Sequence, residues 1–216
     1  MEFLIILLGL LPGFAWLIFF LKEDVHPEPK RMIAKVFFVG AIFTFIALGF
    51  EAIFQDFARN LNIKDTSIFS FFGLSVIEEV FKFLAAYLVV RKSRFFDEPI
   101  DAMIYMIVAA LGFSTVENLA VVFNIVSDAG GVINIMILRF VGATLLHALV
   151  SGVVGFYWAR KKILKGLAIA AILHTVFNYL ILIFSEAVIY PSVFLIIIAF
   201  FVFYDFERLK ARTNTD

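Results

Sequence analysis

The chain has 216 residues, of which 63% are hydrophobic, and its 18 basic and 18 acidic side chains give a formal net charge of zero. Soluble domains are about half apolar, so this composition indicates an integral membrane protein surrounded by a lipid bilayer. The balanced charge gives no reason to expect a nucleic-acid partner. The sequence has no cysteine, which excludes disulfides, thiolate metal sites and a cysteine nucleophile.

Several apolar stretches are long enough to cross a bilayer as helices. They lie at about residues 3–21, 33–54, 68–90, 99–124, 135–159, 163–184 and 188–205. The sequence therefore predicts an all-α, polytopic transmembrane bundle of about seven helices, with residues 1–216 in a single integral membrane domain. The number of helices depends most on the stretch 163–205, which is apolar almost throughout.

Lysine and arginine gather in alternate loops of this predicted bundle. The other loops carry few of them: loop 55–67 has Arg59 and Lys64, and the loops near 125–134 and 185–191 have none. Basic loops remain on the cytoplasmic side of a membrane. We therefore expect the N-terminus outside and the C-terminus in the cytoplasm. The basic segments are 22–35, 91–94, 160–165 and 208–212.

The stretch 68–90 carries Glu78, Glu79 and Lys82 near its middle. A charged side chain at bilayer depth costs at least ~2.5–3.5 kcal/mol on insertion scales, so such residues are rare and face a polar interior. One helical turn separates Lys82 from either carboxylate, so the lysine can reach both. The two glutamates lie ~100° apart around the helix, so one can pair with Lys82 while the other points into a cavity. An ion pair that joins helices explains only one of the two carboxylates.

Further polar side chains lie on later stretches. A lone histidine in a membrane helix often donates an interhelical hydrogen bond. Several carboxylates and histidines at similar depth each have a desolvation cost, and one shared wet pocket satisfies them all. The helical rise places them between the midplane and the outer leaflet, where they can meet. The polar side chains are Glu117, Asn118, Arg139, His147, Ser151, His174 and Asn178, and Phe113 lies one turn before Glu117.

This set of residue types suits hydrolysis of an amide inside the membrane. A carboxylate and a histidine can hold and deprotonate a water molecule. A second histidine and an asparagine can donate hydrogen bonds to the oxyanion as it forms. We expect Glu78 or Glu79 to activate the water, Glu117 to position it, and His174 with Asn178 to stabilise the oxyanion.

With these residues in place, the chain resembles the PrsW-type intramembrane proteases, in the wider group that includes the CAAX prenyl endopeptidases and Abi-related membrane proteins. The CAAX branch usually has histidine in place of Glu117 and arginine in place of Lys82, so both departures favour the PrsW branch. The resemblance covers a core at about residues 68–184. Its motifs are Glu78-Glu79-x-x-Lys82, Glu98-Pro-x-Asp101 with Tyr105, Gly112-Phe113-x-x-x-Glu117-Asn118, Arg139 with His147, and His174-x-x-x-Asn178.

The resemblance implies site-1 cleavage of a single-span anti-sigma factor near its extracytoplasmic boundary, in the plasma membrane of a prokaryote. It implies a supporting role for one set of residues and a catalytic role for another. The supporting set is Lys82, Phe113, Asn118, Arg139 and Ser151. The catalytic set is Glu78, Glu79, Glu117, His147, His174 and Asn178.

Metal dependence has two possible answers. Glu79, Glu117, His147 and His174 could supply the three protein ligands of a catalytic zinc ion. Each histidine, however, lacks a second histidine or a glutamate one turn away on its own helix and has a serine or an asparagine there instead. We therefore expect a glutamate-type protease that needs no cofactor, with zinc as the alternative.

Two other functions fit parts of the pattern. A non-enzymatic ion or proton carrier would use the same carboxylates and histidines as a relay. Carriers typically have broken helices or paired repeats, whereas this chain has no proline between Pro99 and Pro191. A CAAX-like protease with another peptide substrate is the second alternative.

Overall fold

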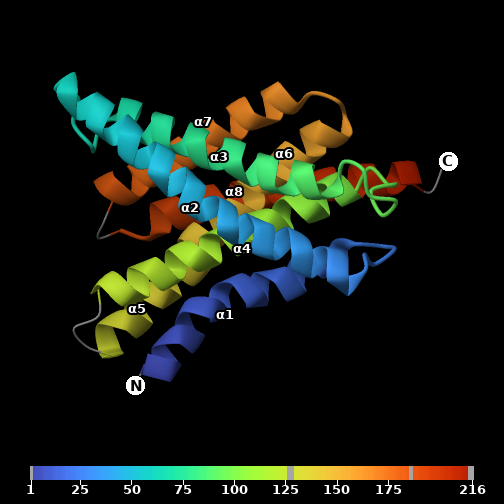
Figure 1. Ribbon diagram of the computed structural model, residues 1–216, viewed down its shortest axis with the longest axis horizontal. Helices are drawn as coiled ribbons and strands as arrows, with labels where there is room; N and C mark the ends of the chain where they lie inside the picture. Colours follow the sequence, from blue (N-terminus) through green and yellow to red (C-terminus); the bar gives the residue numbers. More distant parts are fainter. Residues whose placement is uncertain (1, 126–128, 185–186, 214–216) are drawn as a thin grey trace.

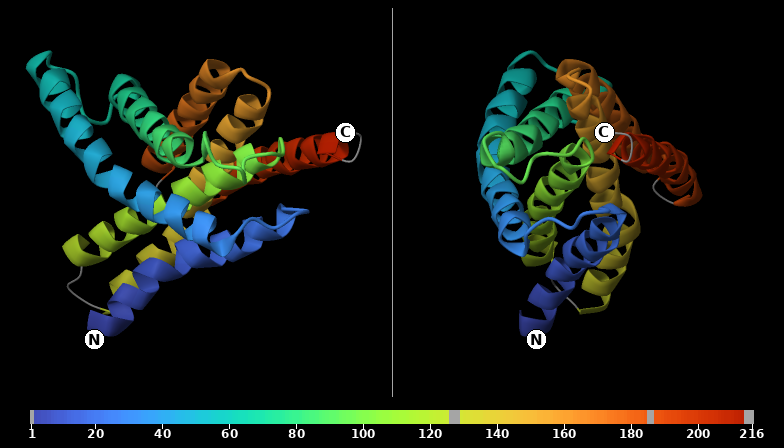
Figure 2. Two further views of the ribbon diagram at one scale, coloured as in Figure 1. Left: turned by 45° about the vertical axis from the view of Figure 1, so that its right-hand side comes forward. Right: turned by 90° about the vertical axis from the view of Figure 1, so that its right-hand side faces the viewer.

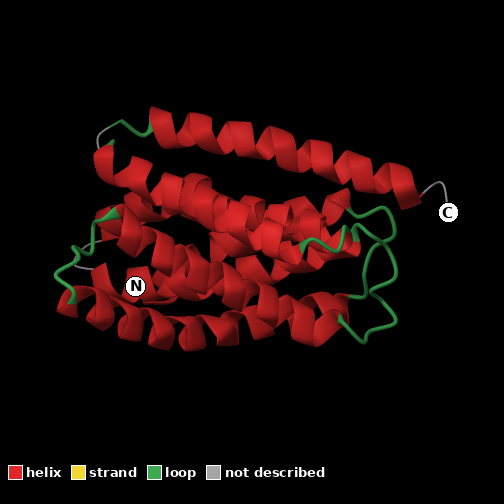
Figure 3. Cartoon of the chain, turned by 90° about the horizontal axis from the view of Figure 1, so that it is seen from above, coloured by secondary structure: helices red, strands yellow, loops and turns green. Residues whose placement is uncertain are grey.

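The computed structural model describes residues 2–125, 129–184 and 187–213. This part of the chain consists of helices joined by short loops and contains no strand (Figure 3). The π-helical turn η2 joins α5 to α6 in one continuous helix. The predicted all-α bundle of about seven helices is confirmed. The helices are α1 (Glu2–Phe20), α2 (Lys30–Asn60), α3 (Ile68–Val90), α4 (Asp101–Ile125), α5 (Ala129–Arg139), η2 (Phe140–Thr144), α6 (Leu145–Ala159), α7 (Ile163–Ile183) and α8 (Ile189–Thr213), with a short 3₁₀ turn at Leu21–Glu23.

Within the described residues, 6 helices are long and apolar enough to cross a membrane, so the chain is a multi-pass membrane protein. α3 has the length of a span but differs from these six because Glu78, Glu79 and Lys82 lie in its middle. Inside a bilayer such charges require partners from neighbouring helices. α3 packs between α2 and α7, and it also contacts α4 and α6.

α4 is the central helix of the bundle (Figures 1 and 2). It packs against α1, α2, α3 and α6. Every side chain from Ala102 to Leu111 is at most 1% exposed. A helix that is apolar on all sides is stable only when it is surrounded, so α4 is enclosed by protein on every side over this segment.

Two glycines allow α2 and α4 to approach closely. A Cβ atom at Gly40 would collide with the backbone of Ala109, and one at Gly112 would collide with the backbone of Phe37. Small residues at helix crossings let backbones come into contact inside membranes. This crossing determines the height and rotation of α4, and therefore the position of Glu117 on its later turns.

The basic loops lie together at one end of the bundle. In Figure 1 the loops 21–29, 91–100 and 160–162 lie at the same end as the last turns of α8, whereas α1 begins at the opposite end. Lys210 Nζ lies 2.7 Å from Glu23 Oε2, which ties the end of α8 to the first link. This arrangement has the alternation that the charge pattern predicts, and the cytoplasmic placement of this end stays a prediction.

Candidate active site

Charged and polar side chains from four helices meet inside the bundle. α3 supplies three of them, and α4, α6 and α7 supply one each. Two carboxylates, Glu78 and Glu117, keep part of their surface exposed, at 13% and 23% of the side chain. The other four are buried. The six are Glu78, Glu79, Lys82, Glu117, His147 and His174.

Lys82 lies at the centre of this cluster. Its Nζ atom is 3.0 Å from Glu78 Oε2 and 2.8 Å from Glu79 Oε1, as their spacing on one helix predicts. It is also 2.6 Å from Nδ1 of His147 on α6. The ring of Phe113 covers the ammonium, with its centroid 4.9 Å away. The side chain of Lys82 is fully buried, and these four contacts surround its charge.

The contacts of His147 determine which nitrogen carries the proton. An ammonium group only donates hydrogen bonds, so Nδ1 of His147 accepts from Lys82. The proton is therefore on Nε2, which donates to Glu117 Oε2 at 3.0 Å. Glu117 Oε2 is held in turn by Nη2 of Arg139 at 3.2 Å. Both ring nitrogens of His147 are engaged, so this ring has no free lone pair for a water molecule.

His174 has a different arrangement. Its Nδ1 atom lies 2.9 Å from Glu79 Oε1, and because a carboxylate only accepts, Nδ1 is the donor. Nε2 therefore presents a lone pair, and it faces Glu78 Oε2 across 3.8 Å. A water molecule about 2.8 Å from each atom can bridge this separation from one side of the line that joins them. His174 and Glu78 are thus the pair best placed to hold a water.

Asn118 and Arg139 connect α4 to the π-helical turn. Arg139 Nε donates to the Asn118 side-chain oxygen, and Asn118 Nδ2 donates to Thr144 Oγ1 at 3.0 Å. Thr144 ends η2 three residues before His147. π-Helical turns occur frequently at functional sites, and this one positions the start of α6.

Two predicted residues lie outside the hydrogen-bonded cluster. The buried hydroxyl of Ser151 has no hydrogen-bond partner among the described residues, so Lys82 and Glu117 orient His147 instead. Asn178 lies one turn after His174 on α7 and lines a pocket.

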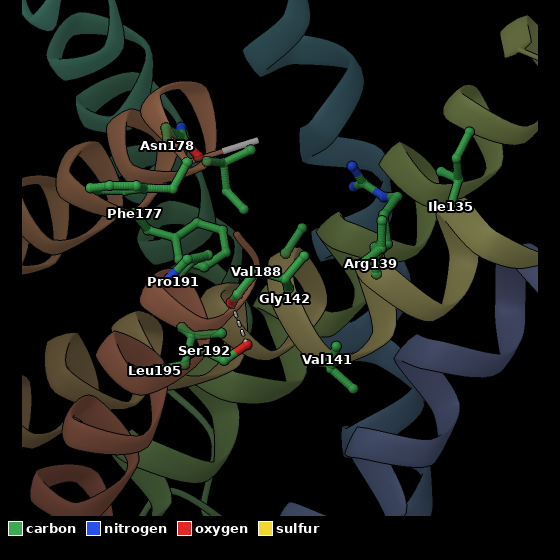
Figure 4. Close-up of a pocket in the computed structure, with 14 residues that line it drawn as sticks. Ile135, Arg139, Val141, Gly142, Phe177, Asn178, Val188, Pro191, Ser192 and Leu195 are labelled. Atoms are coloured by element: carbon green, nitrogen blue, oxygen red, sulfur yellow. Dashed lines mark hydrogen bonds between the residues drawn. The ribbon is translucent and has the colours of Figure 1, made fainter. Parts of the chain in front are cut away.

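This pocket has a volume of about 360 Å³ and lies between η2, the end of α7 and the start of α8. Figure 4 shows Phe177 and Asn178 on one side and Arg139 with Gly142 across from them. Most of the lining side chains are apolar, and Asn178 and Arg139 are its main polar groups. Because Arg139 binds Glu117, the pocket adjoins the polar cluster.

Thr144 and Glu51 were not predicted from the sequence as part of the site. Glu51 on α2 lies within electrostatic range of Glu78, Glu117 and Lys82. The available signal was a carboxylate within an apolar span, the same signal that identified Glu117. Thr144 had a weaker signal, since threonine is common in membrane helices and its partner Asn118 is far away in the sequence.

The motif Glu98-Pro-x-Asp101 with Tyr105 lies apart from this cluster, at the basic-loop end of α4. Asp101 Oδ2 accepts hydrogen bonds from the backbone N–H groups of Asp97 and Glu98, which holds the start of α4. Tyr105 donates to Glu28 Oε2 at 2.6 Å. This motif therefore attaches the link 21–29 to α4, and Tyr105, its nearest member to the cluster, is about 18 Å along the helix from Glu117.

Comparison with known proteins identifies the family. Residues 28–204 match the PrsW family intramembrane metalloproteases. The chain belongs to this family. It is therefore an intramembrane protease, and the resemblance to the PrsW type is confirmed.

Curated relatives share this assignment at moderate identity. Protease PrsW of Oceanobacillus iheyensis is 24% identical over 216 residues, which cover 95% of each chain. Protease PrsW of Geobacillus kaustophilus is 29% identical over 161 residues, 74% of this chain and 68% of that protein. Protease PrsW of Bacillus subtilis is 26% identical over 211 residues, which cover 92% of each chain. No solved structure matches the chain significantly.

The description of the PrsW family implies a metal ion, and a possible ligand group is present. Glu78, Glu79, His147 and His174 each offer one oxygen or nitrogen atom, all within 4.8 Å of one another. Glu78 thus replaces Glu117 in the ligand set expected from the sequence. The reason is that Glu117 binds Nε2 of His147, on the side of the ring away from Lys82.

The donor atoms suit a metal, but their arrangement around Lys82 does not. Zinc binds such donors at ~2.0–2.2 Å. An ion at that distance from Glu78 Oε2 and His147 Nδ1 would be in contact with Lys82 Nζ, which is 3.0 and 2.6 Å from the same atoms. Two cations in contact repel strongly in a buried site. With Lys82 in this position, the site does not fit a metal ion.

Proposed function

We propose that this PrsW family protease hydrolyses a peptide bond of a single-span membrane protein with water activated by Glu78. One observation carries this proposal: Glu78 Oε2 faces the lone pair of His174 Nε2 across 3.8 Å. Glu78 also keeps part of its surface exposed, whereas the side chain of Glu79 is fully buried. A water held between Glu78 and His174 is therefore within reach of a substrate.

The chemistry follows from this placement. The water donates hydrogen bonds to Glu78 Oε2 and His174 Nε2, which leaves an oxygen lone pair for the scissile carbonyl carbon. As the carbon–oxygen bond forms, Glu78 takes the proton as general base. When the tetrahedral intermediate collapses, Glu78 returns the proton to the amide nitrogen that leaves.

Glu79 and Glu117 act as positioning residues in this proposal. Glu79 holds His174 through Nδ1, as the aspartate of a serine-protease triad holds its histidine. Glu117 holds His147, and His147 together with the two α3 carboxylates holds Lys82. The Lys82 ammonium lies 3.0 Å from Glu78 Oε2 and holds this carboxylate in place.

The pocket beside the cluster is where we place the substrate. Its apolar lining suits the hydrophobic side chains of a membrane segment next to the scissile bond. The Asn178 amide on the pocket wall is the donor that we assign to the oxyanion. The substrate helix must unwind there, because a helical backbone keeps its carbonyl groups in hydrogen bonds.

The class of substrate rests on the family resemblance. A single-span anti-sigma factor is the substrate class that we propose, cut near its extracytoplasmic boundary in a prokaryotic plasma membrane. The loop charges support this placement, because they put the end of α3 near Arg91 in the cytoplasm. Glu78 then lies near the middle of α3, one residue to the outer side of its centre.

The experiment is cleavage of a single-span peptide by purified full-length protein in lipid nanodiscs. Glu78→Gln should lower turnover by about 10²–10⁴-fold, the usual contribution of a general base. Asp56→Asn is the matched control, since this exposed carboxylate on α2 lies outside the cluster. Mass spectrometry of the product ends locates the cut. Turnover of Glu78→Gln equal to that of Asp56→Asn would refute the role of Glu78.

A further inference from the structure

We infer that Lys82 is a built-in cation that occupies the position of a divalent metal ion, and that its removal opens a zinc site. The ligands of that site are Glu78, His147 and His174. The inference rests on the proposed function only in treating these residues as the hydrolytic site.

Two of the three separations between the ligand atoms are already close to those of a metal site. Glu78 Oε2 is 3.7 Å from Nδ1 of His147 and 3.8 Å from Nε2 of His174. Ligands at ~2.1 Å from a tetrahedral ion lie about 3.4 Å apart, so a small inward shift would close the site. Two histidines and one glutamate form a known ligand set for catalytic zinc.

The outer contacts of both histidines are those of metal ligands. A histidine that binds a metal typically donates its other N–H to a carboxylate. His147 does so through Nε2 to Glu117, and His174 does so through Nδ1 to Glu79. Each ring therefore directs its remaining lone pair inward, toward Glu78.

Lys82 fills the interior of this ligand set. Its Nζ atom contacts Glu78, Glu79 and His147, and the remaining side of the ammonium is covered by Phe113. The ammonium has no other described anion within hydrogen-bond distance to which it could move. Like a metal ion, it neutralises the carboxylates and sets the tautomer of His147. It leaves no room for a second cation.

The test measures metal binding and does not depend on cleavage. Full-length wild type, Lys82→Ala and Lys82→Met are purified in detergent, checked for a single size-exclusion peak, and dialysed against zinc or cobalt. Metal content is then measured by mass spectrometry, and the visible spectrum of cobalt reports its coordination. Lys64→Ala, which removes an exposed lysine from loop 61–67, is the matched control.

Wild type and Lys64→Ala should hold little metal, whereas Lys82→Ala and Lys82→Met should bind about one ion per chain with a tetrahedral cobalt spectrum. Adding His174→Ala to Lys82→Ala should abolish that binding. One bound zinc in wild type would overturn the inference, as would folded Lys82 variants that bind none. If neither variant folds, the metal content of wild type decides alone. Either outcome leaves the role of Glu78, tested by cleavage, to stand or fall separately.

Discussion

His174 Nδ1 lies 2.9 Å from Glu79 Oε1, and both side chains are almost fully buried. Glu78, which precedes Glu79 in the sequence, lies near the other nitrogen of the His174 ring, Nε2. Two adjacent glutamates on one helix thus lie beside the two nitrogens of one imidazole, and Glu79 is the one hydrogen-bonded to it. Their surroundings differ, so their replacements should have different effects.

Glu79→Gln should lower the stability of the folded protein as well as inactivate it. The change leaves a buried ammonium with one carboxylate fewer, and breaking a buried ion pair costs about 3–5 kcal/mol. Glu78→Gln should lower turnover with a smaller loss of stability, because Glu78 retains some exposure. Thermal unfolding in detergent, measured beside cleavage, separates the two effects. Equal melting temperatures for the two variants would contradict this assignment.

The link between α1 and α2 should respond to pH. Burial raises the pKa of Glu28 and of Asp24 above their ordinary values. A raised carboxyl pKa favours the folded state in acid, and that contribution is lost as the pH rises above the ordinary carboxyl range of about 4. We therefore expect the melting temperature of wild type to fall as the pH rises above about 4.

Glu28→Gln should flatten that dependence, because an amide is always neutral and still accepts the hydrogen bond from Tyr105. Asp56→Asn, on the exposed end of α2, serves as control and should leave the slope unchanged. An identical slope in wild type and Glu28→Gln would show that Glu28 does not titrate in this range.

The crossing of α2 and α4 should have no room for a side chain at Gly40 or Gly112. Gly112→Ala places a methyl group against the backbone of Phe37, and overpacking of this kind costs typically about 1–3 kcal/mol. Gly49 lies on α2 with open space around it, so Gly49→Ala should be neutral or slightly stabilising. Melting temperatures measured in parallel give the comparison. A loss for Gly49→Ala as large as for Gly112→Ala would refute the close crossing.

The orientation in the membrane is testable because the chain has no cysteine of its own. Thr66→Cys and Lys92→Cys lie in the loops at the two ends of α3. An impermeant maleimide should label Thr66→Cys from outside intact cells and Lys92→Cys only after lysis, as the basic loops predict. The reverse pattern would invert the topology and move the proposed cleavage toward the cytoplasmic side.

Helix positions followed from the sequence because an apolar stretch of spanning length is a local property. The stretch expected at 163–184 is the helix Ile163–Ile183, and the one expected at 68–90 is Ile68–Val90. The set of polar residues was also visible, since carboxylates and histidines are conspicuous in apolar helices.

The partners of those residues were not predictable in the same way. Spacing allows Lys82 to reach Glu78 and Glu79, but its contact with His147 depends on how α3 and α6 are rotated. That rotation is set by packing between helices distant in sequence. For the same reason Ser151 was expected to matter on spacing alone, whereas the structure leaves its hydroxyl without a partner among the described residues.

The charges of α3 have a consequence for biosynthesis. Chains emerge from the ribosome N-terminal end first. His147 follows Lys82 by 65 residues, and His174 follows Glu79 by 95. While α3 enters the membrane, the imidazoles that complete its hydrogen bonds have not been made. On the proposed mechanism, the nascent protein carries the acids of α3 without His147 and His174 and cannot cut its neighbours at the translocon. Proteolytic competence then arrives only when α7 takes its place.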